Sequence, residues 1–141
     1  MSPESIEPRF VEFIPSTLDD GVLYVSMEYS TASHRCVCGC GNRVVTPLGA
    51  ADWVLTYDGT VTLSPSVGNG QLACGSHYVI RQNEIRWHRP MTRSSAQRVH
   101  AADNVQRAKA YGHPNRISPW ARASQWFKGW LRSWAHTQRR T

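Results

Sequence analysis

Four cysteines constrain this chain more than any other feature of its sequence; they are Cys36, Cys38, Cys40 and Cys74. The first three alternate with single residues, and the same segment holds Gly39 and Gly41. Four thiolates suit the tetrahedral coordination of zinc, and glycine reaches at low cost the backbone angles that three such close ligands require. We therefore predict one structural Zn²⁺ ion, whose four protein ligands leave no open position for catalysis.

Other interpretations of the cysteines remain open, because the spacing is not the usual pair of Cys-x-x-Cys knuckles. The thiols would otherwise be buried and free, joined in a disulfide, or part of a redox site. His34 lies two residues before Cys36 and is a possible replacement ligand. Residues 1–8 hold two glutamates and no apolar run, so no secretory signal is visible. We therefore expect a cytoplasmic protein, in which clustered cysteines favour a metal over a disulfide.

Charge is distributed unevenly along the chain. Residues 1–80 hold three basic and eight acidic side chains, whereas residues 81–141 hold thirteen basic and two acidic ones. Such asymmetry indicates a folded body followed by a basic extension. We predict a zinc-binding β domain over residues 9–88, a polar basic linker or helix over 89–117, and a basic Trp-rich amphipathic helix over 118–141. A body of about 80 residues is marginal for a self-sufficient core, which also favours a metal staple.

Short β-forming segments separated by turns make up the body. Val22–Ser26 is rich in β-formers, and Asp58-Gly59 is a strong hairpin signal. A second hairpin is expected around Gln82-Asn83, whereas Ser64–Gly70 has the composition of a loop. The predicted fold is mainly β, a small zinc-stabilised antiparallel β domain with a C-terminal helical extension. Its first helix is expected over Ser94–Ala110.

The C-terminal residues have a pattern of their own. From Ser118 on, tryptophans and other apolar residues recur at three- and four-residue steps, with Arg and Lys between them. Such a stripe suits packing on the domain, docking to a partner, a membrane surface or nucleic acid. No nucleic-acid-binding motif favours the last of these.

Two polar motifs have the composition of a hydrolytic site. Ser66 lies beside Gly68 and Asn69, and a serine so placed suits a nucleophile next to an oxyanion hole. The same residue types are also common in ordinary polar turns. In the second motif, Ser76 and His77 follow Cys74 closely. On a strand Ser76 would point with the cysteine, and His77 would point to the opposite face.

Two serine–histidine pairings are open, Ser66 with His77 or Ser76 with His34. Alternatively, both histidines bond to backbone carbonyls and support the zinc loop. No Asp or Glu partner is obvious for either histidine. We favour Ser66 with His77, because Ser66 lies on the expected loop, where a substrate can reach it.

Four segments in order carry a resemblance to a known family: FVEFIPSTLDDGVLYVS, HRCVCGCGNRVVTPL, LSPSVGN and CGSHYVI. Together, over residues 9–88, they resemble an uncharacterised bacterial zinc-binding domain family. Its members are encoded in ubiquitin-like conjugation operons, beside E1-like, E2-like and ubiquitin-like proteins. The resemblance implies that the four cysteines bind the metal. It also aligns the family's polar motif positions with His34, Ser66, Gly68, Asn69, Ser76 and His77. This chain departs from the family pattern at Gly70, where an aromatic residue is common.

The resemblance implies two functions. The first is a serine-type peptidase that processes or removes a bacterial ubiquitin-like protein, with Ser66 and His77 as the favoured pair and Asn69 beside them. The alternative is a non-catalytic, zinc-binding, E3-like adaptor in the same pathway. Either function implies as partners a ubiquitin-like protein and the E1-like and E2-like proteins. The basic tail leaves a membrane or nucleic-acid partner open.

Overall fold

A computed structural model describes residues 3–112 of the chain. The chain divides after Ala110 into two units, and the first, Met1–Ala110, holds all the elements that follow except the last residue of the helix. The Trp-rich helix predicted over 118–141 lies outside the described residues, as do residues 113–117 of the predicted linker.

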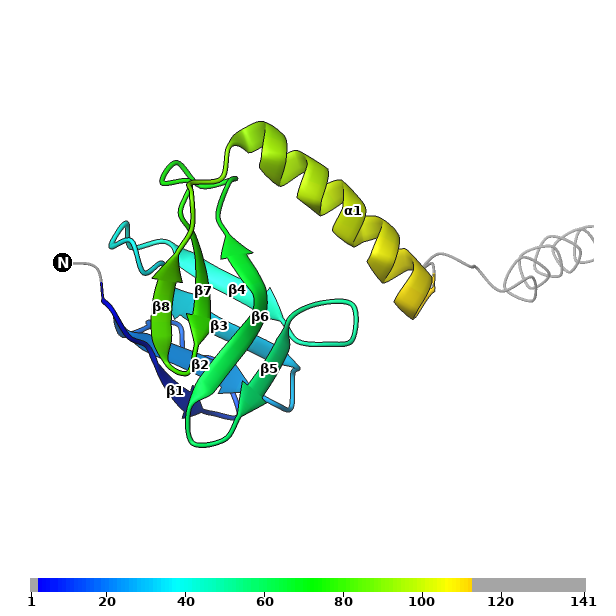
Figure 1. The fold of residues 1–141 in the computed structure, drawn as a ribbon. Coiled ribbons are helices and arrows are strands. Elements are labelled where there is room, and N and C mark those ends of the chain that lie inside the picture. Colours follow the sequence, from blue (N-terminus) through cyan, green and yellow to red (C-terminus); the bar gives the residue numbers. More distant parts are fainter. Residues whose placement is uncertain (1–2, 113–141) are drawn as a thin grey trace, which may run out of the picture. The chain divides into compact units, whose positions relative to one another are not determined.

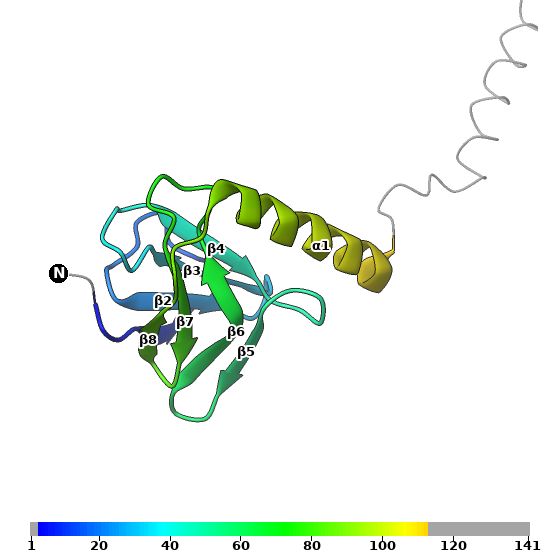
Figure 2. The same cartoon turned by 45° about the horizontal axis from the view of Figure 1, so that its top comes forward.

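Eight strands of the described residues form two four-stranded sheets, with the green strands of the second sheet lying over the blue and cyan strands of the first (Figures 1 and 2). The first sheet contains, in spatial order, β1 (Glu7–Phe10), β2 (Val22–Ser26), β3 (Thr31–Arg35) and β4 (Arg43–Pro47). The second contains β5 (Val54–Tyr57), β6 (Val61–Gly68), β7 (His77–Arg81) and β8 (Glu84–Trp87). This confirms the prediction of a mainly β fold.

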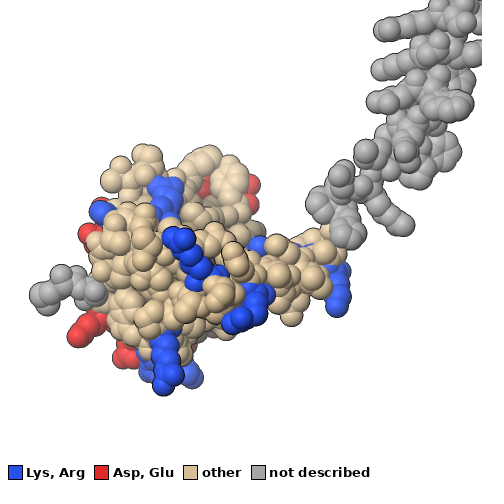
Figure 3. All heavy atoms as spheres, turned by 90° about the horizontal axis from the view of Figure 1, so that it is seen from above, with Lys and Arg blue, Asp and Glu red and all other residues tan. Residues whose placement is uncertain are grey.

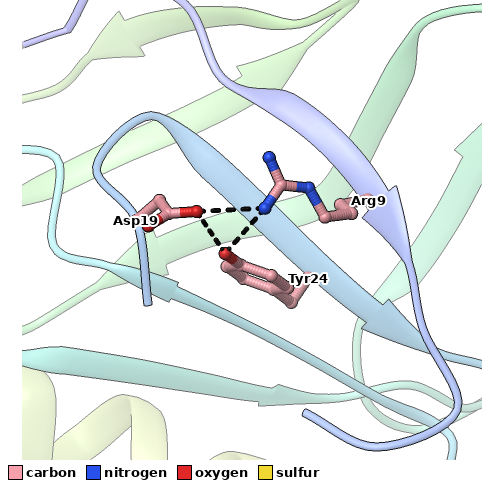
Figure 4. Close-up of polar contacts among 3 residues, drawn as sticks. All are labelled: Arg9, Asp19 and Tyr24. Atoms are coloured by element: carbon pink, nitrogen blue, oxygen red, sulfur yellow. Dashed lines mark hydrogen bonds and ion pairs between the residues drawn. The ribbon is translucent and has the colours of Figure 1, made fainter. Parts of the chain in front are cut away.

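Strand pairing is antiparallel throughout both sheets except between β1 and β2, which are parallel. A parallel pair needs a crossover connection, and residues 11–21 supply it. A small polar cluster ties this connection to the sheet (Figure 4). In it, Asp19 accepts hydrogen bonds from Tyr24 OH at 2.7 Å and from Arg9 Nη1 at 3.0 Å.

The two sheets enclose one apolar core and are joined at both edges. A bridge between Ser5 and Glu84 joins one edge, and a bridge between Leu48 and Trp53 joins the other. Ile6 is fully buried, and its N–H donates to the Asn83 carbonyl, so the β structure extends before residue 9. The largest fully buried apolar side chains come from both sheets: Ile6, Leu23, Leu63, Tyr78 and Ile80.

The turn signals of the sequence are confirmed, but one predicted loop is wrong. Gly59 has a φ of 105°, and Gln82 and Asn83 have positive φ of 52° and 65° at the turn between β7 and β8. The stretch Ser64–Gly70, in contrast, is not a loop throughout, because β6 continues to Gly68. Its pairing with β7 is irregular between Leu63 and Val67, and such a bulge admits turn-type residues into a strand.

The helix α1 spans Arg93–Tyr111, close to the predicted range. Thr92 caps it, because its Oγ1 accepts a hydrogen bond from Ser95 N–H at 3.2 Å. Only Ala96 of this helix is buried, and Arg107 forms an ion pair with Asp52. The helix therefore docks mainly through one alanine and a few polar side chains. No helix among residues 3–112 is long and apolar enough to cross a membrane.

Candidate functional site

The fold brings the four cysteines together from two loops. Cys36 directly follows β3, Cys38 and Cys40 lie in the loop before β4, and Cys74 lies in the loop before β7. Gly39 and Gly41 adopt φ angles of 85° and 78°. Because glycine enters this left-handed region at low cost, the loop can turn its thiols inward within five residues.

The sulfur geometry fits one tetrahedral metal ion. All four Sγ atoms lie within 4.8 Å of one another. Cys36 Sγ lies 3.3 Å from Cys38 Sγ and 4.0 Å from Cys74 Sγ. A tetrahedron with Zn–S bonds of ~2.3 Å places its sulfurs ~3.8 Å apart. Four thiolates favour zinc among the common metals, and such an ion would crosslink the β3–β4 loop to the β6–β7 loop.

Hydrogen-bond donors surround the sulfurs. Ser76 Oγ lies 3.1 Å from Cys36 Sγ and 3.5 Å from Cys74 Sγ. Asn69 Nδ2 donates to Ser76 Oγ at 2.9 Å and lies 3.5 Å from Cys36 Sγ. Asn42 Nδ2 donates to Cys40 Sγ at 3.2 Å. Donors of this kind orient metal ligands and tune their charge, so Asn69 and Ser76 belong to the surroundings of the cluster.

Two thiols of the cluster have pKa values shifted in opposite directions. Burial raises the pKa of the Cys38 thiol to about 12. At Cys40, desolvation also raises the pKa, but hydrogen bonds from the Asn42 backbone, Cys38 and the Asn42 side chain outweigh it and lower the pKa to about 6. Cys40 therefore ionises more readily than Cys38. A bound divalent cation would ionise the other thiols as well.

His34 lies apart from the sulfurs, although it is only two residues from Cys36. It is fully buried, and its Nε2 lies 2.8 Å from Tyr78 OH. Burial lowers the pKa of His34 to about 4, so the ring is neutral at neutral pH. Among the described residues no hydrogen bond joins His34 to Ser76, whose hydroxyl faces Cys36 and Asn69 instead. The structure therefore does not form the Ser76–His34 pairing.

Ser66 and His77 lie on the neighbouring strands β6 and β7 and are in hydrogen-bond contact. Ser66 Oγ lies 2.8 Å from His77 Nε2, and His77 Nδ1 lies 3.1 Å from the carbonyl oxygen of Arg89. A carbonyl only accepts, so Nδ1 carries the proton and Nε2 of the neutral ring offers its lone pair to the serine hydroxyl. This arrangement lets a histidine take the proton of a serine.

Residues Arg89–Thr92, called the strap below, hold the Arg89 carbonyl against His77. Met91 N–H donates to the Gly75 carbonyl at 2.9 Å. A Cβ added at Gly68 would lie 2.5 Å from Met91 Cε, so the glycine leaves room for the methionine side chain. The ring of His88 lies 5.1 Å from that of His77, centroid to centroid. The His77 ring is thus supported by the segment that leads from β8 to α1.

Asn69 is oriented away from this pair. Its side chain is 8% exposed and bonds toward the cysteine cluster, and its backbone N–H donates to the Ser76 carbonyl at 2.8 Å. Hydrogen-bonded pairs alternate along an antiparallel ladder, so the neighbouring pair of Gly68 and His77 is not hydrogen-bonded. The main-chain N–H of Gly68 therefore points away from β7, toward the edge of β6 that β5 does not cover.

Comparison with known proteins identifies the family of this chain. Residues 10–88 match the sequence model of BubE, described as a bacterial ubiquitination-like system serine protease. The chain belongs to the BubE family. This confirms the resemblance to a family of bacterial ubiquitin-like systems that the sequence segments indicated. The match includes the four cysteines, Ser66 and His77, and it ends one residue before Arg89. No curated protein and no solved structure matches the chain.

Several contributors to the site were missed by sequence reasoning. Arg89 acts through its carbonyl and Met91 through packing, and neither residue type signals such a role. Tyr78 was open to prediction, since strand alternation buries the neighbour of an outward-facing His77. The sequence also singled out Gly70, as a departure from the family that the chain resembles. A Cβ at Gly70 would overlap Ala96 Cβ, so the helix packs directly against this glycine.

Proposed function

We propose that this protein is a serine peptidase that cleaves the bond following the C-terminal residue of a bacterial ubiquitin-like protein, in a precursor or in a conjugate. The description of its family supports the reaction class and the pathway. The observation that carries the proposal is the 2.8 Å contact between Ser66 Oγ and His77 Nε2.

In the proposed reaction Ser66 Oγ attacks the scissile carbonyl carbon while its proton passes to His77 Nε2. The Arg89 carbonyl holds Nδ1–H and so keeps the ring in the reactive tautomer and stabilises the imidazolium that forms. His77 then gives the proton to the leaving amine, and an ester to Ser66 remains. A water molecule, deprotonated by His77, hydrolyses this ester and restores the serine. The outward-pointing Gly68 N–H is the donor best placed for the oxyanion.

The metal has a structural part in this proposal. Zinc held by four cysteines has no open coordination position and serves as a crosslink. Cys74 lies three residues before His77, and Ser76 between them contacts two of the sulfurs. Fixing Cys74 would therefore restrict the start of β7 and hold the His77 ring on Ser66. This positioning would support the rate without Lewis-acid chemistry.

The partner in the proposal is the ubiquitin-like protein itself, with the E1-like and E2-like proteins as further candidates. The end of the domain that carries α1 is seen from above in Figure 3. Lys and Arg side chains are spread over this end and along α1, and acidic side chains lie near the margins of the face. Opposite charges steer association. We therefore expect a partner that approaches with neutral or acidic groups around its C-terminal segment.

The test is cleavage of the ubiquitin-like precursor encoded in the same operon, followed by intact-mass measurement. Ser66→Ala and His77→Ala should each lower the rate at least about a thousandfold, because removing a nucleophile or its base leaves only binding and oxyanion effects. Ser64→Ala, an exposed serine two residues away on the same strand, is the matched control. A fluorophosphonate probe should label wild-type protein and Ser64→Ala but not Ser66→Ala.

Two results would overturn the proposal. Normal cleavage by Ser66→Ala and His77→Ala, with loss in Ser76→Ala and His34→Ala, would transfer the chemistry to the other pair. Absence of cleavage and of fluorophosphonate labelling, with metal bound and the fold intact, would favour the non-catalytic adaptor. Circular dichroism and zinc content of every variant show whether the fold persists.

A further inference from the structure

The outer edge of β4 presents backbone groups without a strand partner. Along the β3–β4 ladder, Cys36 N–H donates to the Asn42 carbonyl and Leu48 N–H to the Ser30 carbonyl. Because bonded pairs alternate in an antiparallel ladder, the even-numbered residues of β4 face β3 and the odd-numbered ones face outward. Trp53 N–H confirms this direction, since it donates to the Pro47 carbonyl.

Two outward-facing residues of β4 remain after Pro47 is paired. They are Arg43 and Val45, and no hydrogen bond among the described residues involves the main chain of either one on this side. The Val45 side chain is 52% exposed. An edge with free N–H and C=O groups is a template for another extended chain.

A hollow of about 210 Å³ lies between this edge and the end of β6. One wall is β4 from Arg43 to Thr46, and the other includes Val67 and Gly68, which follow Ser66 directly. Trp53 and Leu72 add apolar surface, and His100 of α1 lines it as well. No carboxylate is among its lining residues in the described part of the chain.

The wall formed by β6 also offers main-chain groups. The Gly68 N–H and C=O point away from β7, as the alternation of its ladder requires. β5 does not cover them, because its pairing with β6 ends at Val54 and Ser64. The hollow thus lies between two open strand edges, and one of them carries Ser66.

We propose that an extended segment of the substrate binds as an added strand along Arg43 and Val45 of β4, opposite Gly68, and that this places its scissile bond at Ser66. The proposal rests on the peptidase function above and names its recognition element. A folded domain cannot enter a hollow of this size, whereas an extended chain terminus can. Main-chain pairing supplies affinity with little demand on sequence, and the apolar lining supplies selectivity.

Val45→Pro tests the proposal in the full-length protein. Proline removes the outward N–H and places its ring in the path of the added strand, while the bonds between β3 and β4 use neighbouring residues. We expect the KM for the ubiquitin-like precursor to rise about tenfold or more, which corresponds to the loss of one hydrogen bond plus steric exclusion. Labelling of Ser66 by a small fluorophosphonate should stay unchanged, because that probe does not need the edge.

Tyr57→Pro is the matched control, since Tyr57 also directs its N–H outward on an edge strand. It lies next to the β5–β6 turn, at the end of the domain opposite α1 (Figure 1). This variant should keep both the KM and the labelling. A Val45→Pro variant that labels normally and cleaves the precursor with an unchanged KM would overturn the inference but leave the peptidase function standing. Absence of fluorophosphonate labelling in the wild-type protein would instead overturn the proposed peptidase function.

A second measurement removes the risk that Val45→Pro misfolds. Peptides that span the precursor cleavage site, each N-methylated at one backbone amide, are offered to the wild-type protein. Added-strand binding predicts that N-methylation at alternate positions raises the KM and that the positions between have little effect. Equal sensitivity at successive positions, or none at any, would refute the added strand.

Discussion

Gly70 shows how one residue joins the helix to the site. The methyl group of Ala96 occupies the space that a side chain at residue 70 would fill. The strap passes beside this glycine, and Met91 Cγ lies 3.0 Å from the position of an added Cβ. Because the strap carries the carbonyl that holds His77, a change at this glycine can displace the proposed base without contacting it. Displacing a reacting group by about 1 Å can lower a rate about a hundredfold.

Gly70→Ala should lower the free energy of unfolding by about 1–3 kcal/mol, as expected for overpacking against a short side chain that cannot move aside. Ala96→Gly in the same chain removes the clashing methyl group, so the double variant should regain part of the loss despite the cost of glycine in a helix. Urea unfolding of the two single variants and the double variant forms a double-mutant cycle. Strictly additive effects would show that the two residues are not in contact.

At the scale of elements, a polar cluster links β1 to the crossover and to β2. Three of the four residues of β1 are exposed. Arg9 of β1 reaches both Asp19 in the crossover and Tyr24 in β2 (Figure 4). The hydrogen bond from Tyr24, followed by that from Arg9, lowers the pKa of Asp19 below its ordinary value of 3.8. The carboxylate therefore links the parallel strand pair in its ionised form.

Acidification should loosen β1 before the rest of the sheet. A carboxyl whose pKa is depressed by folding contributes stability above the ordinary pKa and loses it as the pH falls through the folded value. Amide hydrogen exchange of β1 should therefore accelerate below about pH 4 relative to that of β2. In Tyr24→Phe the pKa of Asp19, followed by carboxyl NMR, should rise toward 3.8. An unchanged Asp19 pKa in this variant would show that Tyr24 does not set it.

At the scale of the whole molecule, the cysteine cluster adjoins the small apolar core. The cluster packs against the core through Cys36 and Val37, so the cysteines and the apolar interior form one unit. Structural zinc sites in small domains contribute about 10–16 kcal/mol, as much as the entire stability of a typical domain. The metal is thus expected to be a condition of folding rather than an addition to it.

Cys74→Ser should abolish the cooperative thermal transition of the domain, and a strong chelator should do the same to the wild-type protein. Restoring zinc should return the transition to the chelated wild type but not to the variant. Purified wild-type protein should hold about one zinc ion per chain, measured by atomic emission. A metal-free preparation with a sharp, unshifted transition would refute a structural metal.

Local chemistry explains which parts of the fold were predictable from the sequence. Asp58-Gly59 and Gln82-Asn83 determine hairpins because their backbones accept positive φ, a property of the residues themselves. The four thiols and the glycines between them predict a metal cluster for a similar reason. The type of ligand and the distance that a loop can span both depend on the local sequence. The loop predicted at Ser64–Gly70 failed because pairing with β7 overrides the preference of turn residues.

The sequence by itself therefore determined the fold class, the turns, the cysteine cluster and the residue types of the candidate site. Only the tertiary structure decided which of these residues meet. Ser66 contacts His77 because the β6–β7 register brings them side by side, and Ser76 faces the sulfurs because strand alternation turns it inward. The carbonyl of Arg89 lies beyond the matched family region and carries no side-chain signal. Such contacts depend on how distant segments pack, and that packing is a property of the assembled core rather than of any single segment.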